Sequence, residues 1–166
     1  GWGIQAACAG ATQVTCVDSS AGAIDSVHHN AKINGLDNIE TIEGDAFDAL
    51  KALCDEKEKF DIVVLDPPAL IPRRRDQKAG EEAYARLNQL GLRLLGRDGL
   101  LVSASCSMHL SQEKLTDIIR GSGRKIDRFV QLLEQGHQAP DHPVVPGIPE
   151  TDYIKSCFVR SLTGFL

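Results

Sequence analysis

Hydrophobic residues gather in short runs along this chain, and longer stretches with a different periodicity separate the runs. Runs rich in valine, isoleucine and leucine occur at 14–17, 62–65 and 100–104. Between them, apolar residues recur at the spacing of an amphipathic helix. This alternation is typical of an α/β fold in which helices cover a mainly parallel sheet.

The first two thirds of the chain are predicted to form three strand–helix units and a fourth strand. Gly35 and Gly96 are expected to end two of the helices, and Pro67 with Pro68 stops the third strand. The expected strands are 13–18, 38–43, 60–66 and 99–105, and the expected helices are 20–34, 46–57 and 80–95.

The last third is predicted to contain one helix and two strands that flank a long loop. Four prolines in the loop exclude regular structure, and two strands joined in this way are expected to be antiparallel. The glycine-rich Gly121-Ser122-Gly123 is expected to end the helix, which Ser111 would cap. The expected elements are a helix at 111–120, a strand at 126–133, the loop at 136–150 and a strand at 153–162.

Composition narrows the class of protein. With 166 residues, of which 42% are hydrophobic and 25% charged, the chain suits one globular domain. Its five cysteines show neither a disulfide framework nor zinc-ligand spacing, so we expect no metal and reduced thiols in a cytoplasmic protein. No apolar run approaches the roughly 20 residues that span a bilayer. A formal net charge of -5 excludes a surface that is basic throughout, but not a local RNA-binding cluster.

Three acidic residues are expected at the carboxyl ends of strands, where open α/β sheets bind their ligands. Asp18 either accepts ribose hydroxyls, as in nucleotide-binding sheets, or is a solvated turn residue. Asp45 either caps the helix at 46–57 or binds an adenine amino group, and the two roles are compatible. Asp66 precedes two prolines, which fix a rigid turn and aim the carboxylate into the crevice.

Several short motifs occur in an order that resembles a known family. On these motifs, the chain resembles the class I S-adenosylmethionine-dependent methyltransferases, and within them the bacterial ribosomal RNA 5-methylcytosine enzymes that carry a PUA domain. The resemblance implies a Rossmann-like sheet with an antiparallel C-terminal strand. The motifs are Val17-Asp18-Ser19-Ser20, Gly44-Asp45-Ala46-Phe47, Leu65-Asp66-Pro67-Pro68-Ala69, Ser105-Cys106-Ser107, and His142-Pro143 with Tyr153-Ile154-Lys155.

The resemblance also implies a site for S-adenosyl-L-methionine. Relatives carry PUA and connecting domains, and a first strand that leads into the glycine-rich cofactor loop. This sequence starts inside that loop, at Gly1-Trp2-Gly3, so the first strand is expected to be missing and the strand at 13–18 to have an unpaired edge. Such an edge invites pairing in a homodimer. The implied cofactor-binding residues are Gly1, Gly3, Asp18, Ser19, Asp45, Ala46, Asp66 and Pro67.

Cys106 is the expected nucleophile, with Asp66 as the second catalytic residue. Carbon-5 of cytosine accepts a methyl group readily only after a thiolate has added to carbon-6, and a helix start or a cation favours the thiolate. Asp66 would hydrogen-bond the ring nitrogen. The competing interpretation is a buried structural cysteine, as predicted for the other four, but the small polar neighbours Ser105 and Ser107 favour a site.

The function predicted from these residues is methylation of carbon-5 of a cytosine in ribosomal RNA. The basic residues Arg73, Arg74, Arg75 and Lys78 either contact RNA phosphates or are simply solvated. Methylation of a base nitrogen is an alternative, although such enzymes place an aromatic residue where Ala69 stands. A binding domain without catalysis is another. A nicotinamide-dependent dehydrogenase shares the sheet but leaves Cys106 and the double proline unexplained.

Overall fold

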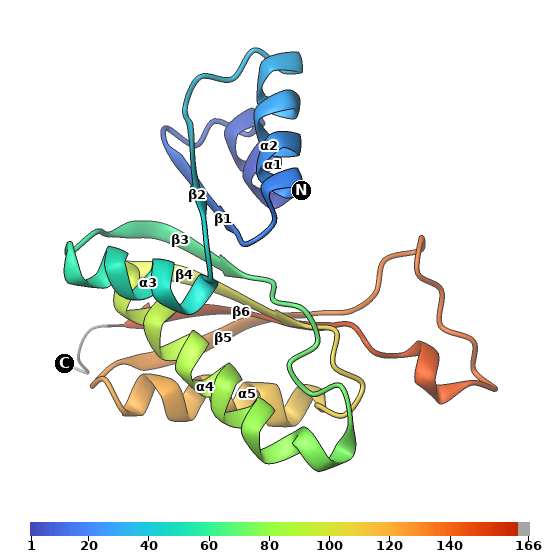
Figure 1. Ribbon diagram of the computed structural model, residues 1–166. Helices are drawn as coiled ribbons and strands as arrows, with labels where there is room; N and C mark the ends of the chain where they lie inside the picture. The colour runs from blue at the N-terminus through green and yellow to red at the C-terminus, as the bar shows by residue number, and fades with distance from the viewer. Residues whose placement is uncertain (163–166) are drawn as a thin grey trace. The chain divides into compact units, whose positions relative to one another are not determined.

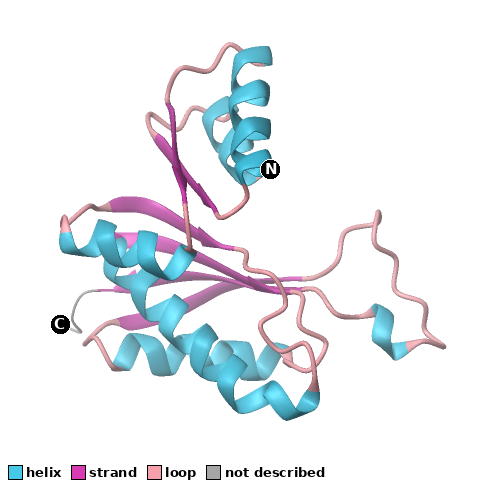
Figure 2. Ribbon diagram, viewed as in Figure 1, coloured by secondary structure: helices cyan, strands magenta, loops and turns pink. Residues whose placement is uncertain are grey.

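The computed structural model describes residues 1–162 and contains two compact units, each with its own sheet (Figures 1 and 2). The first unit is Gly1–Glu56, and the second begins at Lys57. The sequence predicted one sheet, whereas the structure has a two-stranded and a four-stranded sheet. No helix within the described residues is long and apolar enough to cross a membrane.

The first unit pairs two parallel strands and carries three helices. Strand β1 (Val14–Asp18) pairs with β2 (Ile39–Glu43) along its whole length. Within residues 1–162, no further strand pairs with the outer edge of either β1 or β2. The helices are α1 (Trp2–Cys8), α2 (Ala21–Ile33) and α3 (Ala46–Asp55), and α1 and α2 lie beside the two strands (Figure 1).

Local sequence signals define where α2 begins and ends. Ser20 is the N-cap, and its hydroxyl oxygen accepts a hydrogen bond of 3.3 Å from the Ala23 N–H. Gly35 adopts a left-handed φ of 65°, and its N–H donates to the Lys32 carbonyl just beyond the last turn. The predicted helix and its glycine terminator are therefore confirmed.

The second unit is a four-stranded sheet in the order β3-β4-β6-β5. β3 and β4 are parallel, whereas β6 is antiparallel to both of its neighbours, so β3, β4 and β5 run one way and β6 the other. The predicted antiparallel final pair is confirmed, and three of the four strands run in the same direction. The strands are β3 (Phe60–Leu65), β4 (Leu95–Ser105), β5 (Phe129–Gly136) and β6 (Lys155–Leu162).

Two helices, α4 (Gln77–Leu94) and α5 (Gln112–Arg124), cover one face of the four-stranded sheet (Figure 1). Gly91 brings α4 close to the strands, because a Cβ there would lie 2.9 Å from a Leu65 methyl group and 3.2 Å from one of Leu101. Leu101 is fully buried at this contact. Each such leucine contributes about 1.5 to 3 kcal/mol through its burial.

The predicted end of α5 is wrong. The helix runs through Gly121-Ser122-Gly123 and ends at Arg124. Ser122 is buried, and its hydroxyl donates to the Ala85 carbonyl on α4 at 3.0 Å. A Cβ on Gly123 would lie 2.9 Å from the Arg128 carbonyl oxygen. These small residues therefore let the helix pack closely, and the packing outweighs their low helix propensity.

Other boundaries differ by a few residues from those predicted. α4 begins at Gln77, so Lys78 lies in its first turn rather than in a loop, and Gly96 lies within β4 rather than after a helix. β5 begins at Phe129, after a turn in which Asp127 has a φ of 55°. The proline-rich segment between β5 and β6 is an extended loop with one short 3-10 turn, η2 (Pro149–Thr151) (Figure 2).

Candidate functional site

The first unit places Asp18 and Asp45 at the carboxyl ends of neighbouring strands. Asp18 is the last residue of β1 and pairs in register with Glu43 of β2. The Gly44 N–H donates to the Asp18 carbonyl oxygen at 3.0 Å, which ties the two strand ends together. The Asp18 side chain is exposed, and its Oδ1 accepts the Ser20 N–H at 2.9 Å. Parallel pairing thus brings the two predicted acids to one edge.

Asp45 serves as a helix cap in this structure. It is the N-cap of α3, and its Oδ1 accepts hydrogen bonds from the Phe47 N–H at 2.8 Å and the Asp48 N–H at 3.2 Å. An N-cap of this kind stabilises a helix by about 1 kcal/mol. The capping role weighed from the sequence is therefore confirmed, and a role in ligand binding stays a prediction.

Gly1 and Gly3 belong to the start of a helix rather than to a loop. Gly1 is the N-cap of α1, and Gly3 lies in its first turn. A Cβ on Gly3 would collide with the Cys16 sulfur and lie 3.2 Å from Val14 Cγ1. The expected tail of a glycine-rich loop is thus replaced by a close contact between α1 and β1, for which Gly3 provides the space.

The second unit places Asp66 and Cys106 at adjacent strand ends. Asp66 directly follows β3 and Cys106 directly follows β4, two parallel strands in which Leu65 pairs with Ser103. Asp66 is exposed and Cys106 half-buried. The loop after Asp66 is also bound to the Cys106 segment, because the Ile71 N–H donates to Ser107 Oγ at 3.1 Å. The predicted juxtaposition of these two strand ends is confirmed.

Ser105 and Ser107, on either side of Cys106, are buried in a polar network. The Tyr84 hydroxyl on α4 lies 2.8 Å from Ser105 Oγ and 3.0 Å from Ser107 Oγ. Ser105 Oγ also accepts the Ser107 N–H at 3.0 Å. The two serines were expected to line a crowded site, but they are core residues that hold the backbone of Cys106 in place.

Lys155 reaches the same segment from β6. The sequence analysis included it in the Tyr153-Ile154-Lys155 motif but gave it no role of its own. It pairs in register with Ser105, and its Nζ donates to the Ser107 carbonyl oxygen at 2.8 Å. Burial lowers the pKa of Lys155 below its usual range, while the nearby Asp152 and Cys106 act in the opposite direction. The signal in the sequence was periodicity, because Lys155 continues the core-facing alternation of Cys157 and Val159.

The basic residues after the double proline lie on the surface. Arg73 Nε lies 2.9 Å from Asp76 Oδ2, and Arg75 Nε lies 3.9 Å from Oδ1 of the same carboxylate. Arg74 begins the 3-10 turn η1 (Arg74–Asp76), and Lys78 follows in α4. All four side chains are exposed, so the structure leaves them accessible to a large ligand.

Two of the remaining cysteines lie in environments that disfavour a thiolate. Burial raises the pKa of the Cys157 thiol, despite hydrogen bonds from Thr116 and Gln112, and burial also raises that of Cys16. Both are therefore expected to stay protonated and unreactive at neutral pH. Within residues 1–162, no group of three His, Cys, Asp or Glu side chains is arranged to hold a metal ion.

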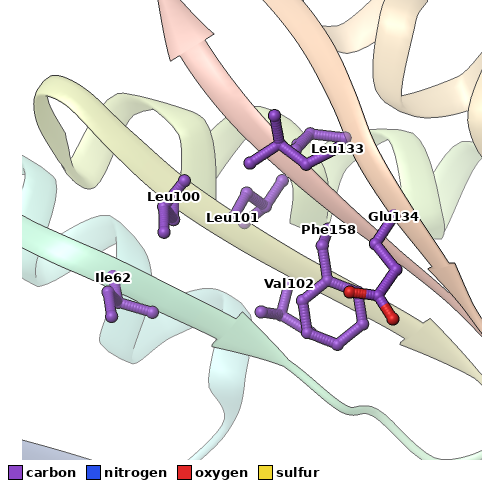
Figure 3. A pocket seen from close by; sticks show the side chains of 8 residues that line it. Ile62, Leu100, Leu101, Val102, Leu133, Glu134 and Phe158 are labelled. Atoms are coloured by element: carbon purple, nitrogen blue, oxygen red, sulfur yellow. The ribbon is translucent and has the colours of Figure 1, made fainter.

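A hollow of about 310 Å³ lies on the face of the four-stranded sheet that α4 and α5 leave uncovered (Figure 3). Its lining is almost entirely apolar and includes Ile62, Val102 and Phe158, with Glu134 at one side. Ile62 is 58% exposed. The hollow contains neither Asp66 nor Cys106, and its apolar lining does not suit a charged cofactor.

Comparison with known proteins relates this geometry to methyltransferases. Ribosomal RNA large subunit methyltransferase I of Klebsiella pneumoniae is 36% identical over 96% of the chain, and its counterpart in Citrobacter koseri is 35% identical over the same share. The chain spans about 40% of the length of these curated relatives. Among solved structures, that of SMU.776 is described as a methyltransferase complexed with SAH. It matches 95% of this chain with a TM-score of 0.80 and 22% sequence identity, and the match covers 41% of the SMU.776 chain.

These likenesses define the fold and the family. The structural match shows an α/β Rossmann-like fold of the class I methyltransferase type, as predicted. The family model described as conserved hypothetical protein 95 matches residues 1–116, well over half of the sequence. The chain therefore belongs to the conserved hypothetical protein 95 family.

Proposed function

We propose that this chain carries the catalytic site of an S-adenosylmethionine-dependent methyltransferase that modifies carbon-5 of a cytosine in ribosomal RNA. The observation that carries the proposal is the position of Asp66 and Cys106 at adjacent strand ends, with the two segments bound to each other through Ile71 and Ser107. The names of the relatives, which are ribosomal RNA large subunit methyltransferases, support RNA as the substrate class.

The polar groups of the first unit fit the adenosine part of the cofactor. Asp18 has an exposed carboxylate that can accept ribose hydroxyls, and Asp45 can accept from the adenine amino group while its Oδ1 caps α3. The main chain at Ser19 and Ala46 adjoins these acids. In the second unit, Asp66 and Pro67 stay predicted cofactor contacts. The SAH complex of SMU.776 supports this cofactor, because SAH is the product that S-adenosylmethionine leaves after methyl transfer.

Cys106 performs the covalent step in this proposal. Its thiolate forms a bond to carbon-6 of cytosine, and the displaced electron pair makes carbon-5 nucleophilic. Bound S-adenosylmethionine supplies the electrophilic methyl group that carbon-5 takes up. A base or a water molecule then removes the carbon-5 proton, and the electron pair that this releases breaks the carbon–sulfur bond and restores the thiolate. Asp66 hydrogen-bonds the ring nitrogen and stabilises the adduct.

Replacement of the nucleophile tests the proposal. Cys106→Ala should lower methylation of ribosomal RNA by about 10³-fold or more, since removal of a nucleophile abolishes the covalent route. Cys8→Ala is the matched control, because Cys8 is exposed on α1 and has no part in the site. RNA that contains 5-fluorocytosine should form a covalent adduct with the wild-type protein and with Cys8→Ala only.

Two results would contradict the proposal. If Cys106→Ala kept full activity, Cys106 would not be the nucleophile. If mass analysis of the modified nucleoside placed the methyl group on a base nitrogen, the reaction at carbon-5 would be wrong even with Cys106 required.

A further inference from the structure

Ser107 is a fully buried junction between separate segments of the second unit. Its N–H donates to Ser105 Oγ at 3.0 Å, its hydroxyl oxygen accepts the Ile71 N–H at 3.1 Å, and that oxygen lies 3.0 Å from the Tyr84 hydroxyl. Its carbonyl oxygen accepts a hydrogen bond of 2.8 Å from Lys155 Nζ. These partners come from β4, the loop after β3, α4 and β6. The N–H, carbonyl and hydroxyl groups of this residue are therefore all held by the surrounding fold.

The bond to Ile71 anchors the loop that carries Asp66. The Ile71 side chain is only 1% exposed, so this residue is fixed by packing as well as by its N–H. Residues 66–70, here called the Asp66 loop, connect the end of β3 to this anchor, and two consecutive prolines restrict their φ angles. A short, stiff chain that is held at both ends has few conformations left. The place of the Asp66 loop relative to Cys106 therefore depends on the anchor.

Gly80 provides the space for the same anchor on α4. A Cβ at this position would collide with Ile71 Cγ1 and would lie 2.5 Å from the Leu70 carbonyl oxygen. Gly80 is buried in the first turn of α4, where alanine would be the better helix former. The missing side chain thus lets residues 70 and 71 pack closely against the helix.

We propose that Ser107 and Gly80 are positioning residues that fix the place of the Asp66 loop relative to Cys106. Ser107 provides the hydroxyl to which the anchor is bound, and Gly80 provides the space into which the anchor packs. Reacting groups must be held near their productive geometry, and an error of about 1 Å in their placement lowers a rate by roughly 10²-fold. The inference deepens the proposed function, on which it rests for the roles of Asp66 and Cys106.

A comparison of Ser107→Ala with Ser105→Ala tests the hydroxyl. Both serines are buried, and each hydroxyl oxygen contacts the Tyr84 hydroxyl and one N–H, but only that of Ser107 binds Ile71. Ser107→Ala keeps the main-chain bonds of its own segment. It should lower single-turnover methylation of ribosomal RNA by roughly 10²-fold, and Ser105→Ala should stay at least about tenfold more active. Iodoacetamide should alkylate Cys106 in Ser107→Ala at the wild-type rate.

Amide hydrogen exchange follows the anchor without any methylation. The Ile71 amide should exchange at least about tenfold faster in Ser107→Ala than in the wild-type protein, because its acceptor is gone. In Ser105→Ala that acceptor remains, so the Ile71 amide should exchange at close to the wild-type rate. Exchange therefore separates loss of the anchor from a general loss of stability.

Gly80→Ala tests the space and leaves every partner of Ser107 in the sequence. Gly121→Ala is the matched control, because Gly121 also lies within a helix and a Cβ there would meet no atom within 4 Å. Gly80→Ala should lower methylation by roughly 10²-fold and leave the alkylation of Cys106 unchanged, whereas Gly121→Ala should change neither. If Ser107→Ala does not fold, the two glycine variants give the decision.

Two results would overturn the inference. Equal losses of methylation in the two serine variants would make Ser107 a merely structural residue. Full methylation by folded Gly80→Ala would show that the Asp66 loop does not need this space. A Cys106→Ala variant that still methylates RNA would refute the proposed function instead, and faster exchange of the Ile71 amide in Ser107→Ala would then still support the anchor.

Discussion

The two units of this protein hold their candidate functional groups in opposite ways. In the first unit, Asp18 and Asp45 are exposed, and their carboxylates bind backbone N–H groups two or three residues further along. In the second unit, the segment around Cys106 is held by Tyr84 and Lys155, which are distant in sequence and buried. The first arrangement depends on local backbone geometry, and the second depends on tertiary packing.

This difference separates binding from reactivity. Exposed carboxylates suit reversible hydrogen bonding to a polar ligand, since water screens them and they pay little desolvation cost. A buried network is stiffer, and each of its polar groups is costly to leave unpaired. We therefore expect substitutions in the second unit to change stability more than those in the first.

The largest expected effect on stability is that of Tyr84→Phe. The change removes the hydroxyl that bonds both Ser105 and Ser107, and leaves their buried oxygens short of a partner. The free energy of unfolding should fall by about 1 to 3 kcal/mol, measured by urea denaturation. Tyr153→Phe is the matched control at a half-buried tyrosine and should cost less than about 0.5 kcal/mol. If both variants lost the same free energy of unfolding, the buried network around Tyr84 would be no more stabilising than the contacts of the half-buried Tyr153.

An intermediate effect is expected at Asp45. Its alanine variant and its serine variant together separate the role in capping α3 from the role in binding the cofactor. Asp45→Ala should lose about 1 kcal/mol of stability, whereas Asp45→Ser keeps the cap of α3 and should lose little. Both should bind S-adenosylhomocysteine about tenfold more weakly in calorimetry, because both lack the carboxylate. Unchanged affinity of the serine variant would reduce Asp45 to a helix cap.

The smallest effect is expected at the exposed arginines, where salt dependence is the sensitive measurement. Within the described residues, Arg74 has no ion pair, whereas the Arg73 guanidinium pairs with Asp76 at 2.9 Å. Arg74→Gln should lower RNA affinity modestly and reduce the slope of log affinity against log salt by about 0.7 to 1. Arg73→Gln should change the slope less, since its charge is already compensated. An unaltered slope in both variants would mean that this surface is merely solvated.

The features predicted correctly from the sequence are those that depend on neighbouring residues. Ser20 as a cap, Gly35 as a terminator and Asp45 at the start of α3 all act within four residues, so their chemistry is visible in a short window. The strand ends at Asp66 and Cys106 were also correct, because a proline pair and an apolar run mark them. The parallel pairing of β3 with β4 then follows from the alternation of strands and helices.

The errors and omissions come from contacts between distant residues. Tyr84 and Ser105 are 21 positions apart, and Ser107 and Lys155 are 48 apart. Nothing near Ser105 distinguishes a site serine from one that bonds a core tyrosine. Similarly, the sequence around Gly123 predicts a helix break, because it does not show that the Arg128 carbonyl oxygen packs closely against this glycine. That no strand pairs with the outer edge of β1 within residues 1–162 could be anticipated only from the family resemblance.

The reversed direction of β6 has a consequence for how this fold can be modified. Parallel strands bring only their final residues to the carboxyl edge of the sheet, but β6 enters the sheet there and contributes its first residue, Lys155. The exposed loop that precedes it is joined to the sheet at both ends by the β5–β6 register. New segments inserted into that loop would leave the register of Lys155 opposite Ser105 unchanged, which makes the loop a natural position for grafting.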